Sequence, residues 1–409
     1  MNKQQEPRLR FKGFTGAWEE KRLSDVVEIV GGGTPDTNNS AYWGGEIDWY
    51  SPTEIGENVY ANGSIRKITL LGLQKSSAVI LPADRTVLFT SRASIGDMAI
   101  LTKQGATNQG FQSFIVREGL NIYFLYTMGF KIKEYALKNA SGSTFLEISK
   151  TQLLQMESLF PSLTEQTHLG LFFRRLDSLI AESRAVLEKS RQLKKAMLAK
   201  MFPANGEKIP KIRFKGFEGE WERNELGCLG YCLSGIGFSE NEQGGANGIP
   251  FFKVSDMNLS GNEVYLRKAN NYVTQEQIDK QRWQVIQQLP CIFFAKVGAA
   301  LLLNRKRLVN TPFLLDNNTM AFILDSSLDN YFMKTLFDTI DLPALAQIGA
   351  LPSINAKDIE KNIVFIPTPK EQTAIGNFFR QLDETIALQS AEVEKLNQLK
   401  KGLLAAMLV

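Results

Sequence analysis

Residues Glu165 to Met201 read EQTHLGLFFRRLDSLIAESRAVLEKSRQLKKAMLAKM, with no proline and a single glycine near the start. The stretch returns near the C-terminus as Glu371 to Met407, EQTAIGNFFRQLDETIALQSAEVEKLNQLKKGLLAAM. The two copies align without a gap, and 21 of the 37 positions are identical. A long repeat that follows a different globular stretch each time predicts two similar structural units in one chain.

Both copies have the spacing of a long amphipathic helix. Apolar residues recur three and four positions apart, beginning with Leu169, Phe172 and Phe173. At about 1.5 Å per residue, each copy spans roughly 55 Å. A helix with one apolar stripe is not stable alone, so we expect the two copies to form an antiparallel pair about a pseudo-two-fold axis. Ala196 and Gly402, at matching positions, are expected to let the helices approach closely.

A second repeat opens each unit as a basic, aromatic leader. Pro7 to Leu23 reads PRLRFKGFTGAWEEKRL and Pro210 to Leu226 reads PKIRFKGFEGEWERNEL, with ten of 17 positions identical. The favoured interpretation is a packing strap whose aromatic side chains cover a neighbouring element. The aromatic residues concerned are Phe11, Phe14 and Trp18. The alternative is direct DNA contact by Arg10 and Lys12.

The stretches between leaders and long helices mix short β-rich runs, turns and amphipathic segments, so the predicted fold class is α/β (α+β). The expected order is a leader at 1–22, a globular domain at 23–163, a long helix at 164–202, a second leader at 203–225, a second domain at 226–368 and a second long helix at 369–409. Leu88–Arg92 resembles Ile292–Lys296, since each is a strand that runs into a basic residue. By the same comparison Asn108-Gln109 is paired with Asn317-Asn318. The shared order predicts one fold with two different surfaces.

Composition limits the class of protein. The 409 residues are 44% hydrophobic and 22% charged, which is typical of globular domains, and the net charge of +4 permits a nucleic-acid partner without requiring one. Three cysteines, an odd number confined to the second half, argue against a disulfide framework, and a reducing compartment is expected. No apolar run reaches about 18 residues, so a cytoplasmic chain without a membrane span is predicted.

Motifs for catalysis are missing from the sequence. There is no phosphate-binding G-x-x-x-x-G-K-[ST], no G-x-G-x-x-G, and no Asn/Asp-Pro-Pro-aromatic tetrad for methyl transfer to a base amine. The one histidine, His168, lies on the predicted helix and cannot supply a general-base pair. Asp36, Glu46 and Asp48 lack the Glu-x-Lys of a nuclease carboxylate cluster. We therefore expect neither a catalytic residue nor a metal site.

The ordered set of motifs resembles the specificity subunit of type I restriction–modification enzymes over essentially the whole chain. The first half carries Gly31-Gly32-Gly33-Thr34-Pro35 with Tyr42-Trp43-Gly44-Gly45, Leu88 to Gly96, Asn108-Gln109-Gly110, Ser141-Gly142-Ser143-Thr144, Ile148-Ser149, Pro161 with Glu165-Gln166, and Leu176-Asp177 with Ile180. The second half carries Gly235-Ile236-Gly237-Phe238, Lys253 to Asn258, Phe294 to Gly298, Asp316-Asn317-Asn318, Pro369, Glu371-Gln372, and Leu382-Asp383 with Ile386. No single motif is diagnostic, but the same order occurs twice.

The resemblance implies a non-catalytic subunit of a multisubunit restriction endonuclease and adenine-N6 DNA methyltransferase. Each globular stretch would be a target recognition domain that reads one half of a bipartite, asymmetric site in double-stranded DNA. The helices would set the unread spacer, at most roughly 16 base pairs, and dock two modification subunits that carry S-adenosylmethionine. Restriction subunits with ATP and Mg would join them, so no cofactor is expected in this chain. Gly235-Ile236-Gly237-Phe238 departs from the Gly-Thr-Pro turn, which predicts two different half-sites.

The candidate DNA contacts are polar or basic residues beside aromatics, because Asn and Gln can pair with adenine, Arg and Lys with guanine, and cations with phosphates. They are Thr34, Tyr42, Arg66, Lys67, Ser91, Arg92, Asn108, Gln109, Ser143, Lys253, Asn258, Lys296, Arg305, Arg307 and Asn317. For each alone, the alternative is a solvated charge or a turn former. Candidates for helix pairing or partner docking are Phe172, Phe173, Arg174, Leu176, Lys194, Phe378, Phe379, Arg380, Leu382 and Lys400. The competing function is a coiled-coil assembly scaffold that does not contact DNA.

Overall fold

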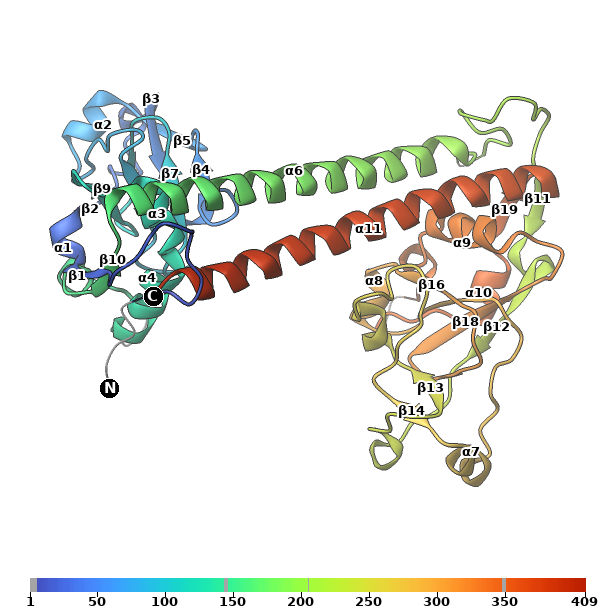
Figure 1. The fold of residues 1–409 in the computed structure, drawn as a ribbon. Coiled ribbons are helices and arrows are strands. Elements are labelled where there is room, and N and C mark those ends of the chain that lie inside the picture. Colours follow the sequence, from blue (N-terminus) through green and yellow to red (C-terminus); the bar gives the residue numbers. More distant parts are fainter. Residues whose placement is uncertain (1–5, 143–145, 205, 348–350) are drawn as a thin grey trace. The chain divides into compact units, whose positions relative to one another are not determined.

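The computed structural model describes residues 6–142, 146–204, 206–347 and 351–409, and it divides into two units. Unit 1 comprises Met1–Glu182 with Val393–Val409, and unit 2 comprises Ser183–Glu392. Both unit boundaries fall inside the long helices, α6 (Leu163–Met201) and α11 (Pro369–Met407), which Figure 1 draws in green and red. Each unit therefore contains one globular domain and part of both long helices.

Unit 1 is built on two main sheets. The five-stranded sheet has the order β2 (Val27–Gly31), β9 (Gln112–Val116), β6 (Thr86–Phe89), β7 (Met98–Leu101) and β4 (Tyr60–Ala61). The three-stranded sheet has the order β5 (Arg66–Ile68), β3 (Trp43–Tyr50) and β8 (Gly105–Thr107). The strand β1 (Glu19–Arg22) pairs with β10 (Glu157–Phe160). The shorter helices are α1 (Leu23–Val26), η1 (Ser40–Tyr42), η2 (Pro52–Glu54), α2 (Leu70–Gln74), α3 (Ile122–Thr127), α4 (Gly129–Asn139) and α5 (Lys150–Leu154).

Unit 2 repeats this plan. Its four-stranded sheet has the order β12 (Gly230–Ser234), β18 (Thr319–Leu324), β15 (Cys291–Ala295) and β16 (Lys306–Val309), and its three-stranded sheet has the order β14 (Tyr272–Val273), β13 (Ile249–Phe252) and β17 (Leu314–Leu315). The strand β11 (Glu222–Glu225) pairs with β19 (Ile363–Ile366). The shorter helices are η3 (Leu226–Cys228), η4 (Glu240–Glu242), η5 (Val254–Asn258), α7 (Gln275–Gln281), α8 (Ala299–Leu302), α9 (Asn330–Thr339), η6 (Pro343–Leu345) and α10 (Ala356–Glu360).

The two globular domains have the same topology. The order β2-β9-β6-β7 matches β12-β18-β15-β16, and in each smaller sheet the central strand has one antiparallel and one parallel neighbour. The prediction of one fold in two copies is confirmed.

The residue-by-residue pairing of the two halves was wrong by one position. The Ile148 N–H donates to the Ser91 carbonyl (3.0 Å), and the Ile354 N–H donates to the Lys296 carbonyl (3.1 Å). Ser91 rather than Arg92 is thus the counterpart of Lys296. The sequence comparison matched basic residues with each other, whereas strand register is set by which residues face the core.

The loop after the parallel strand shows the same error. The Asn108 N–H donates to the Tyr50 carbonyl (3.0 Å), and the Asp316 N–H donates to the Phe252 carbonyl (3.1 Å). Asn108 therefore corresponds to Asp316, and the next residues, Gln109 and Asn317, correspond to each other. The longer motifs Asn108–Gly110 and Asp316–Asn318 align correctly.

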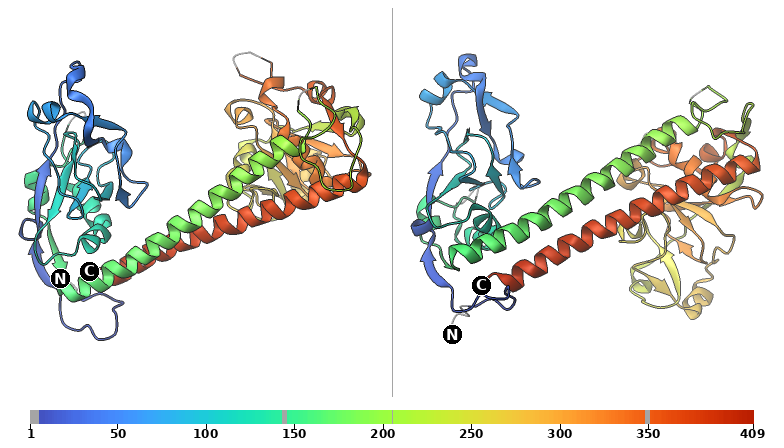
Figure 2. Two further views of the ribbon diagram at one scale, coloured as in Figure 1. Left: turned by 90° about the horizontal axis from the view of Figure 1, so that it is seen from above. Right: turned by 45° about the horizontal axis from the view of Figure 1, so that its top comes forward.

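The long helices meet in the same way in both units. In unit 1 the Lys400 ammonium near the end of α11 lies 2.5 Å from Asp177 on α6, and in unit 2 Lys194 near the end of α6 lies 2.6 Å from Asp383 on α11. The end of one helix thus lies beside the beginning of the other, which confirms the antiparallel pairing (Figure 2). The expectation for Gly402 was wrong, because a Cβ built there would meet nothing within 4 Å.

Close approach occurs instead at Gly170 and Gly376, near the helix starts. A Cβ on Gly170 would lie 2.7 Å from Oδ1 of Asn121, and one on Gly376 would lie 2.3 Å from Oδ1 of Asp329. Asn121 and Asp329 are the N-cap residues of α3 and α9, and their Oδ1 atoms accept the N–H groups of the third residues of those helices. Each glycine therefore lets a long helix pack against the N-terminus of a domain helix.

Each leader is a packing strap, as favoured from the sequence. Arg10 donates to both carboxylate oxygens of Glu165 (2.8 Å each) and to the Gly16 carbonyl (2.7 Å). The ring centroids of Phe11 and Phe172 lie 5.6 Å apart. The Arg10 guanidinium is thus committed to contacts inside unit 1, and the alternative of DNA contact by this side chain is not supported.

The second strap makes the same contacts. Arg213 donates to both oxygens of Glu371 (2.6 Å each) and to the Gly219 carbonyl (2.6 Å). Both straps also reach the end of the other long helix, where the Leu9 N–H donates to the Ala406 carbonyl and the Ile212 N–H to the Lys200 carbonyl (2.9 Å each).

Candidate nucleic-acid interface

Four segments of unit 1 meet beyond the end of β6. The Gly33 N–H donates to the Thr107 carbonyl, the Ser91 N–H to the Gly110 carbonyl (2.8 Å each), and the Thr34 hydroxyl to the Gln109 side-chain oxygen. With the Ile148–Ser91 bond, these contacts bring the glycine-rich loop, the turn after β8, the end of β6 and the segment before Ser149 together. We call this group the first loop cluster. It contains Thr34, Ser91, Arg92, Asn108 and Gln109.

The glycine-rich loop supports this cluster by close packing. A Cβ on Gly32 would lie 2.0 Å from the Asn108 carbonyl oxygen. Gly32 therefore serves close contact with the next turn, which explains the motif without a phosphate cradle.

The members of the first loop cluster divide into framework and exposed residues. Ser91 is fully buried, and Oδ1 of Asn108 accepts the Gly110 N–H (2.8 Å). Gln109 is exposed, and Thr34 and Arg92 are half-buried. Ser143, the remaining candidate on this side, lies outside the described residues. Gln109 and Arg92 are therefore the side chains best placed to reach a ligand.

A neighbouring group surrounds Trp43 on the three-stranded sheet. The Arg66 guanidinium lies 3.6 Å from the Trp43 ring centroid, and Lys67 lies 3.5 Å from Asp48. Both cations are exposed, whereas Tyr42 is half-buried at the end of η1. Trp49 joins this group to the first loop cluster, because its indole N–H donates to the Gly33 carbonyl (2.8 Å).

Unit 2 has a second loop cluster at the equivalent place. The Ile236 N–H donates to the Leu315 carbonyl (2.9 Å), and the Lys296 N–H donates to the Asn318 carbonyl (2.8 Å). Asn317 is exposed, as Gln109 is in unit 1. Lys253 donates to the Gln243 side chain (3.0 Å).

The departure from the Gly-Thr-Pro turn has a physical consequence in this second cluster. Phe238 stacks on Phe251 with 3.7 Å between ring centroids and an interplanar angle of 6°. Trp283 closes the group edge-on, 5.8 Å from Phe238. The turn of unit 2 is thus packed through Phe238 onto the buried Phe251, whereas the turn of unit 1 is joined to Gln109 through Thr34.

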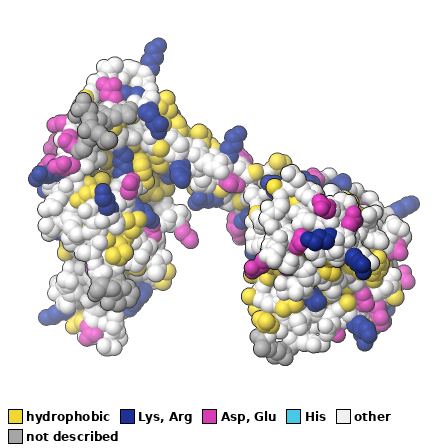
Figure 3. All heavy atoms as spheres, turned by 90° about the horizontal axis from the view of Figure 1, so that it is seen from below, with side chains coloured by type: hydrophobic (Ala, Val, Ile, Leu, Met, Phe, Trp, Pro, Cys, Tyr) yellow, Lys and Arg dark blue, Asp and Glu magenta, His cyan; other side chains and the backbone are white. Residues whose placement is uncertain are grey.

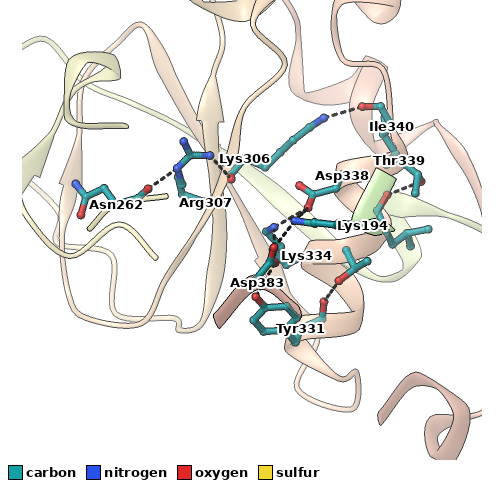
Figure 4. A network of polar contacts seen from close by, with 12 residues as sticks. Lys194, Asn262, Lys306, Arg307, Tyr331, Lys334, Asp338, Thr339, Ile340 and Asp383 are labelled. Atoms are coloured by element: carbon teal, nitrogen blue, oxygen red, sulfur yellow. Dashed lines mark hydrogen bonds and ion pairs between the residues drawn. The ribbon is translucent and has the colours of Figure 1, made fainter. Parts of the chain in front are cut away.

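The basic run Arg305–Arg307 is not a surface patch, which corrects its sequence interpretation. Lys306 is 2% exposed and donates to the Ile340 carbonyl (2.7 Å). Arg307 donates to the carbonyls of Lys306 (2.9 Å), Met257 (3.3 Å) and Asn262, as Figure 4 shows for Lys306 and Asn262. The run enters strand β16, where alternate side chains face opposite sides. Arg305 alone stays exposed, hydrogen-bonded to Asn258.

The buried Lys306 predicts a measurable pH dependence. Burial lowers the pKa of Lys306 from 10.5 to about 8, against the opposing effect of Asp338 and Asp341. Between about pH 8 and 10.5 the unfolded chain holds this proton and the folded chain does not, so the free energy of unfolding should rise with pH by up to ~1.4 kcal/mol per unit. Lys306→Met should remove this rise when urea denaturation is compared at pH 7.5 and 9.5.

The exposed Lys361 provides the control for that experiment. Lys361→Met should keep the slope of the unmodified chain. Equal slopes in Lys306→Met and the unmodified chain would mean that Lys306 titrates normally in the folded state.

The helix residues proposed for pairing or docking occupy three environments. Phe173 and Phe379 are fully buried, while Leu176 and Leu382 lie on the inner helix faces. Phe172 and Phe378 are half-buried beneath the strap phenylalanines Phe11 and Phe214. Lys194 and Lys400 are in ion pairs within the chain, and Arg174 and Arg380 are exposed. Only the two arginines of this set present their charge to an outside partner.

Sequence reasoning missed the anchor residues at the helix starts. Gln166 accepts the Asn121 N–H (3.0 Å), and the Tyr123 hydroxyl donates to Asp177 (2.8 Å). In unit 2 Gln372 accepts the Asp329 N–H (3.2 Å), and Tyr331 donates to Asp383 (2.8 Å). The glutamine and the aspartate are identical in the two helix copies, and this identity could have indicated their structural role.

Charges on the surface are mixed. On the face shown in Figure 3, Lys and Arg side chains are interspersed with Asp and Glu rather than gathered in one basic patch. Among the residues that the structure describes, no three His, Cys, Asp or Glu side chains are grouped as metal ligands. Within the same residues, no helix combines the length and apolar character needed to cross a membrane.

Comparison with known proteins finds relatives that all have the same described role. The family model described as "Type I restriction modification DNA specificity domain" matches twice, at residues 16–189 and 218–398. The specificity subunit of the type I restriction enzyme MjaIX from Methanocaldococcus jannaschii is 28% identical over 408 residues, covering 95% of this chain and 91% of that protein. The EcoR124I/EcoR124II specificity subunit of Escherichia coli is 29% identical over 180 residues, which cover 42% of this chain and 43% of that protein.

Solved structures agree on the fold. The S subunit of a type I restriction-modification system from M. genitalium superposes with a TM-score of 0.64 at 14% identity, over 99% of both chains. A chain from a study of complex assembly and conformational transition in the type I R-M system gives 0.55 at 17% identity, over 95% of this chain and 96% of that one.

Proposed function

The chain belongs to the family of type I restriction–modification specificity subunits, and from that premise we propose that each globular domain reads one half of a bipartite, asymmetric DNA site. The observation that carries the proposal is a constant scaffold with divergent loop clusters. Both domains share strand order and anchor contacts. Their clusters differ at matching positions: unit 1 has Ser91 where unit 2 has Lys296, and Asn108 where unit 2 has Asp316. Two different clusters on one scaffold fit two different half-sites.

The chemistry of DNA reading is assigned to the exposed members of each cluster. Gln109 and Asn317 occupy the same position and both carry an exposed amide, the group that pairs bidentately with the adenine edge. The exposed or half-buried cations among the candidates would add guanine or phosphate contacts. These cations are Arg66, Lys67, Arg92, Lys253, Lys296 and Arg305. Thr34, Tyr42, Ser91, Asn108 and Asn258 would position them, and Arg307 leaves the set because its donors are used inside unit 2.

The long helices are assigned two tasks. They would fix the length of the unread spacer, and they would dock the two modification subunits, with Arg174 and Arg380 as exposed matching cations. S-adenosylmethionine, ATP and Mg would be held by the partner subunits, and this chain would carry no catalytic residue. Restriction subunits would bind the same assembly.

A mobility-shift experiment with the methyltransferase partners separates this function from an assembly scaffold without DNA contact. The chain with its modification subunits should slow the migration of one specific duplex. The affinity of the complex for this DNA should fall as salt rises, because phosphate contacts release counterions. The modification subunits without the chain serve as the control. An equal shift of the duplex with and without the chain would contradict the proposal.

A further inference from the structure

A pocket of about 620 Å³ lies in unit 1 between the globular domain and α6, outside the first loop cluster. Its lining combines tyrosines with carboxylates. The tyrosines are Tyr50, Tyr60 and Tyr123, and the acids are Glu54, Asp177 and Glu182. The Tyr60 and Tyr123 rings form one wall, with centroids 6.3 Å apart. Aromatic faces beside carboxylates attract a cation.

Unit 2 has an equivalent tyrosine wall, but there the space that corresponds to the pocket is filled by a side chain of the unit itself. The ring centroids of Tyr265 and Tyr331 lie 6.4 Å apart, and those of their counterparts in unit 1 lie 6.3 Å apart. Strand register aligns Ala99 on β7, opposite Leu88, with Arg307 on β16, opposite Phe293. The Arg307 guanidinium is held there by main-chain carbonyls, including those of the loop before Tyr265.

Two small residues open the space in unit 1. Ala99 and Ala61 line the pocket, and their counterparts are Arg307 and Leu266. The loop before Tyr60 contributes Asn58 and Val59 to the lining. The pocket is therefore the space in which the second domain holds an arginine side chain.

The charges around the pocket also differ between the units. Asp383 in unit 2 has Lys194 at 2.6 Å and Lys334 at 3.5 Å. Within the described residues of unit 1, Asp177 forms one ion pair, with Lys400. The second lysine is missing because Tyr126 stands at the position of Lys334. In addition, Glu182 stands where α11 has Leu388. Unit 2 in turn places Asp338 beside both lysines, where unit 1 has Phe130. The first copy thus has fewer cations for a similar number of carboxylates.

The Tyr50 hydroxyl is a further polar group that unit 2 lacks. The residue is 1% exposed, and among the residues that the structure describes the hydroxyl has no partner in hydrogen-bonding geometry. Burial raises the pKa of Tyr50, and the nearby Gly63 main chain opposes this only in part. The matching residue in unit 2 is Phe252, which requires no partner. A buried hydroxyl without a partner in the pocket wall points to a ligand that supplies one.

We propose that this pocket binds a guanidinium group, presented by an arginine side chain of a partner protein. Guanidinium stacks on aromatic faces and offers five donors in a plane, which suits tyrosine rings, a hydroxyl and carboxylates better than a compact ammonium does. The carboxylates exclude a phosphate, so DNA is not the occupant. Ser178, Ala181 and Glu182 of α6 form one rim. The choice of a modification subunit as the source of the arginine rests on the proposed function, whereas the chemistry of the pocket does not.

The pocket is tested with N-acetylarginine amide and the full-length chain carrying 3-fluorotyrosine, observed by fluorine NMR. Tyr60→Phe and Tyr123→Phe assign the two signals. We expect both signals to shift saturably with the arginine amide, and N-acetyllysine amide to need at least about tenfold more ligand. Ala99→Arg should fill the pocket as Arg307 does and abolish the response. Equal shifts with both amides, or an unchanged response in Ala99→Arg, would overturn the inference.

Two further variants keep the test independent of how well Ala99→Arg folds. Glu182→Leu, which copies the residue of unit 2, should weaken the arginine response several-fold, and the exposed Glu188→Leu on the same helix should not. In a second arm, Glu182→Leu should bind the modification subunit more weakly than Glu188→Leu does. Equal binding would refute the partner assignment, whereas failure of the unmodified chain to bind that subunit would refute the proposed function instead.

Discussion

Glu371→Ala is expected to lower the free energy of unfolding by about 3–5 kcal/mol, because it leaves the Arg213 guanidinium without its carboxylate. The Glu371 side chain is 1% exposed and that of Arg213 is 14% exposed, so water replaces the lost contact poorly. The bidentate geometry also fastens the second strap to the start of α11. Urea denaturation followed by tryptophan fluorescence, with the buried Trp221 as a local reporter, measures the loss.

Three further variants serve as comparisons for Glu371→Ala. Glu165→Ala should be as damaging, because Arg10 and Glu165 make the same pair in unit 1. Removing both partners of the second pair, as Arg213→Met with Glu371→Leu, should restore most of the stability. Glu220→Ala breaks an exposed pair with Lys208 and should cost less than ~1 kcal/mol. If Glu371→Ala costs no more than Glu220→Ala, the straps are not held by these arginines.

The scaffold could be predicted because its signals are local and repeated. The 3.6-residue spacing and the duplication gave both long helices, and their pairing followed from the need to bury one apolar stripe each. The bounds observed, Leu163–Met201 and Pro369–Met407, lie within two residues of the expected ones. Helix ends depend on capping contacts that composition does not show.

The binding faces could be predicted only in part, because strand register decides which way a side chain points. Lys306 and Arg307 look basic in sequence, yet both are used inside unit 2, where β16 places them against α9 and the 257–262 loop. Glu165 and Asp177, identical in both copies, were open to detection as structural anchors. The correspondence of Ala99 with Arg307 had no such signal, because it depends on the pairing of β6 with β7 and of β15 with β16.

Replacing residues 226–366 with residues 23–160 of the same chain should convert the asymmetric DNA site into one with two inverted copies of the first half-site. The junctions keep the strand register, because the incoming β10 replaces β19 opposite β11, and Glu222 pairs with Ile366 where Glu19 pairs with Phe160. The incoming Tyr123 would reach Asp383, because both domains offer a tyrosine to the aspartate of their long helix. Methylation sequencing of a host that expresses the chimaera with its modification subunits reads out both halves and the spacer.

The reverse exchange provides the matched control and a stricter test. Placing residues 226–366 in the first position should duplicate the second half-site, again with an unchanged spacer, because neither long helix is altered. It also carries Arg307 into the position of Ala99, so the guanidinium pocket of unit 1 is filled. If that pocket receives an arginine of a modification subunit, this chimaera should methylate its new site less completely than the first chimaera does. A site in which both halves change would contradict independent reading, and a changed spacer would contradict its control by the helices.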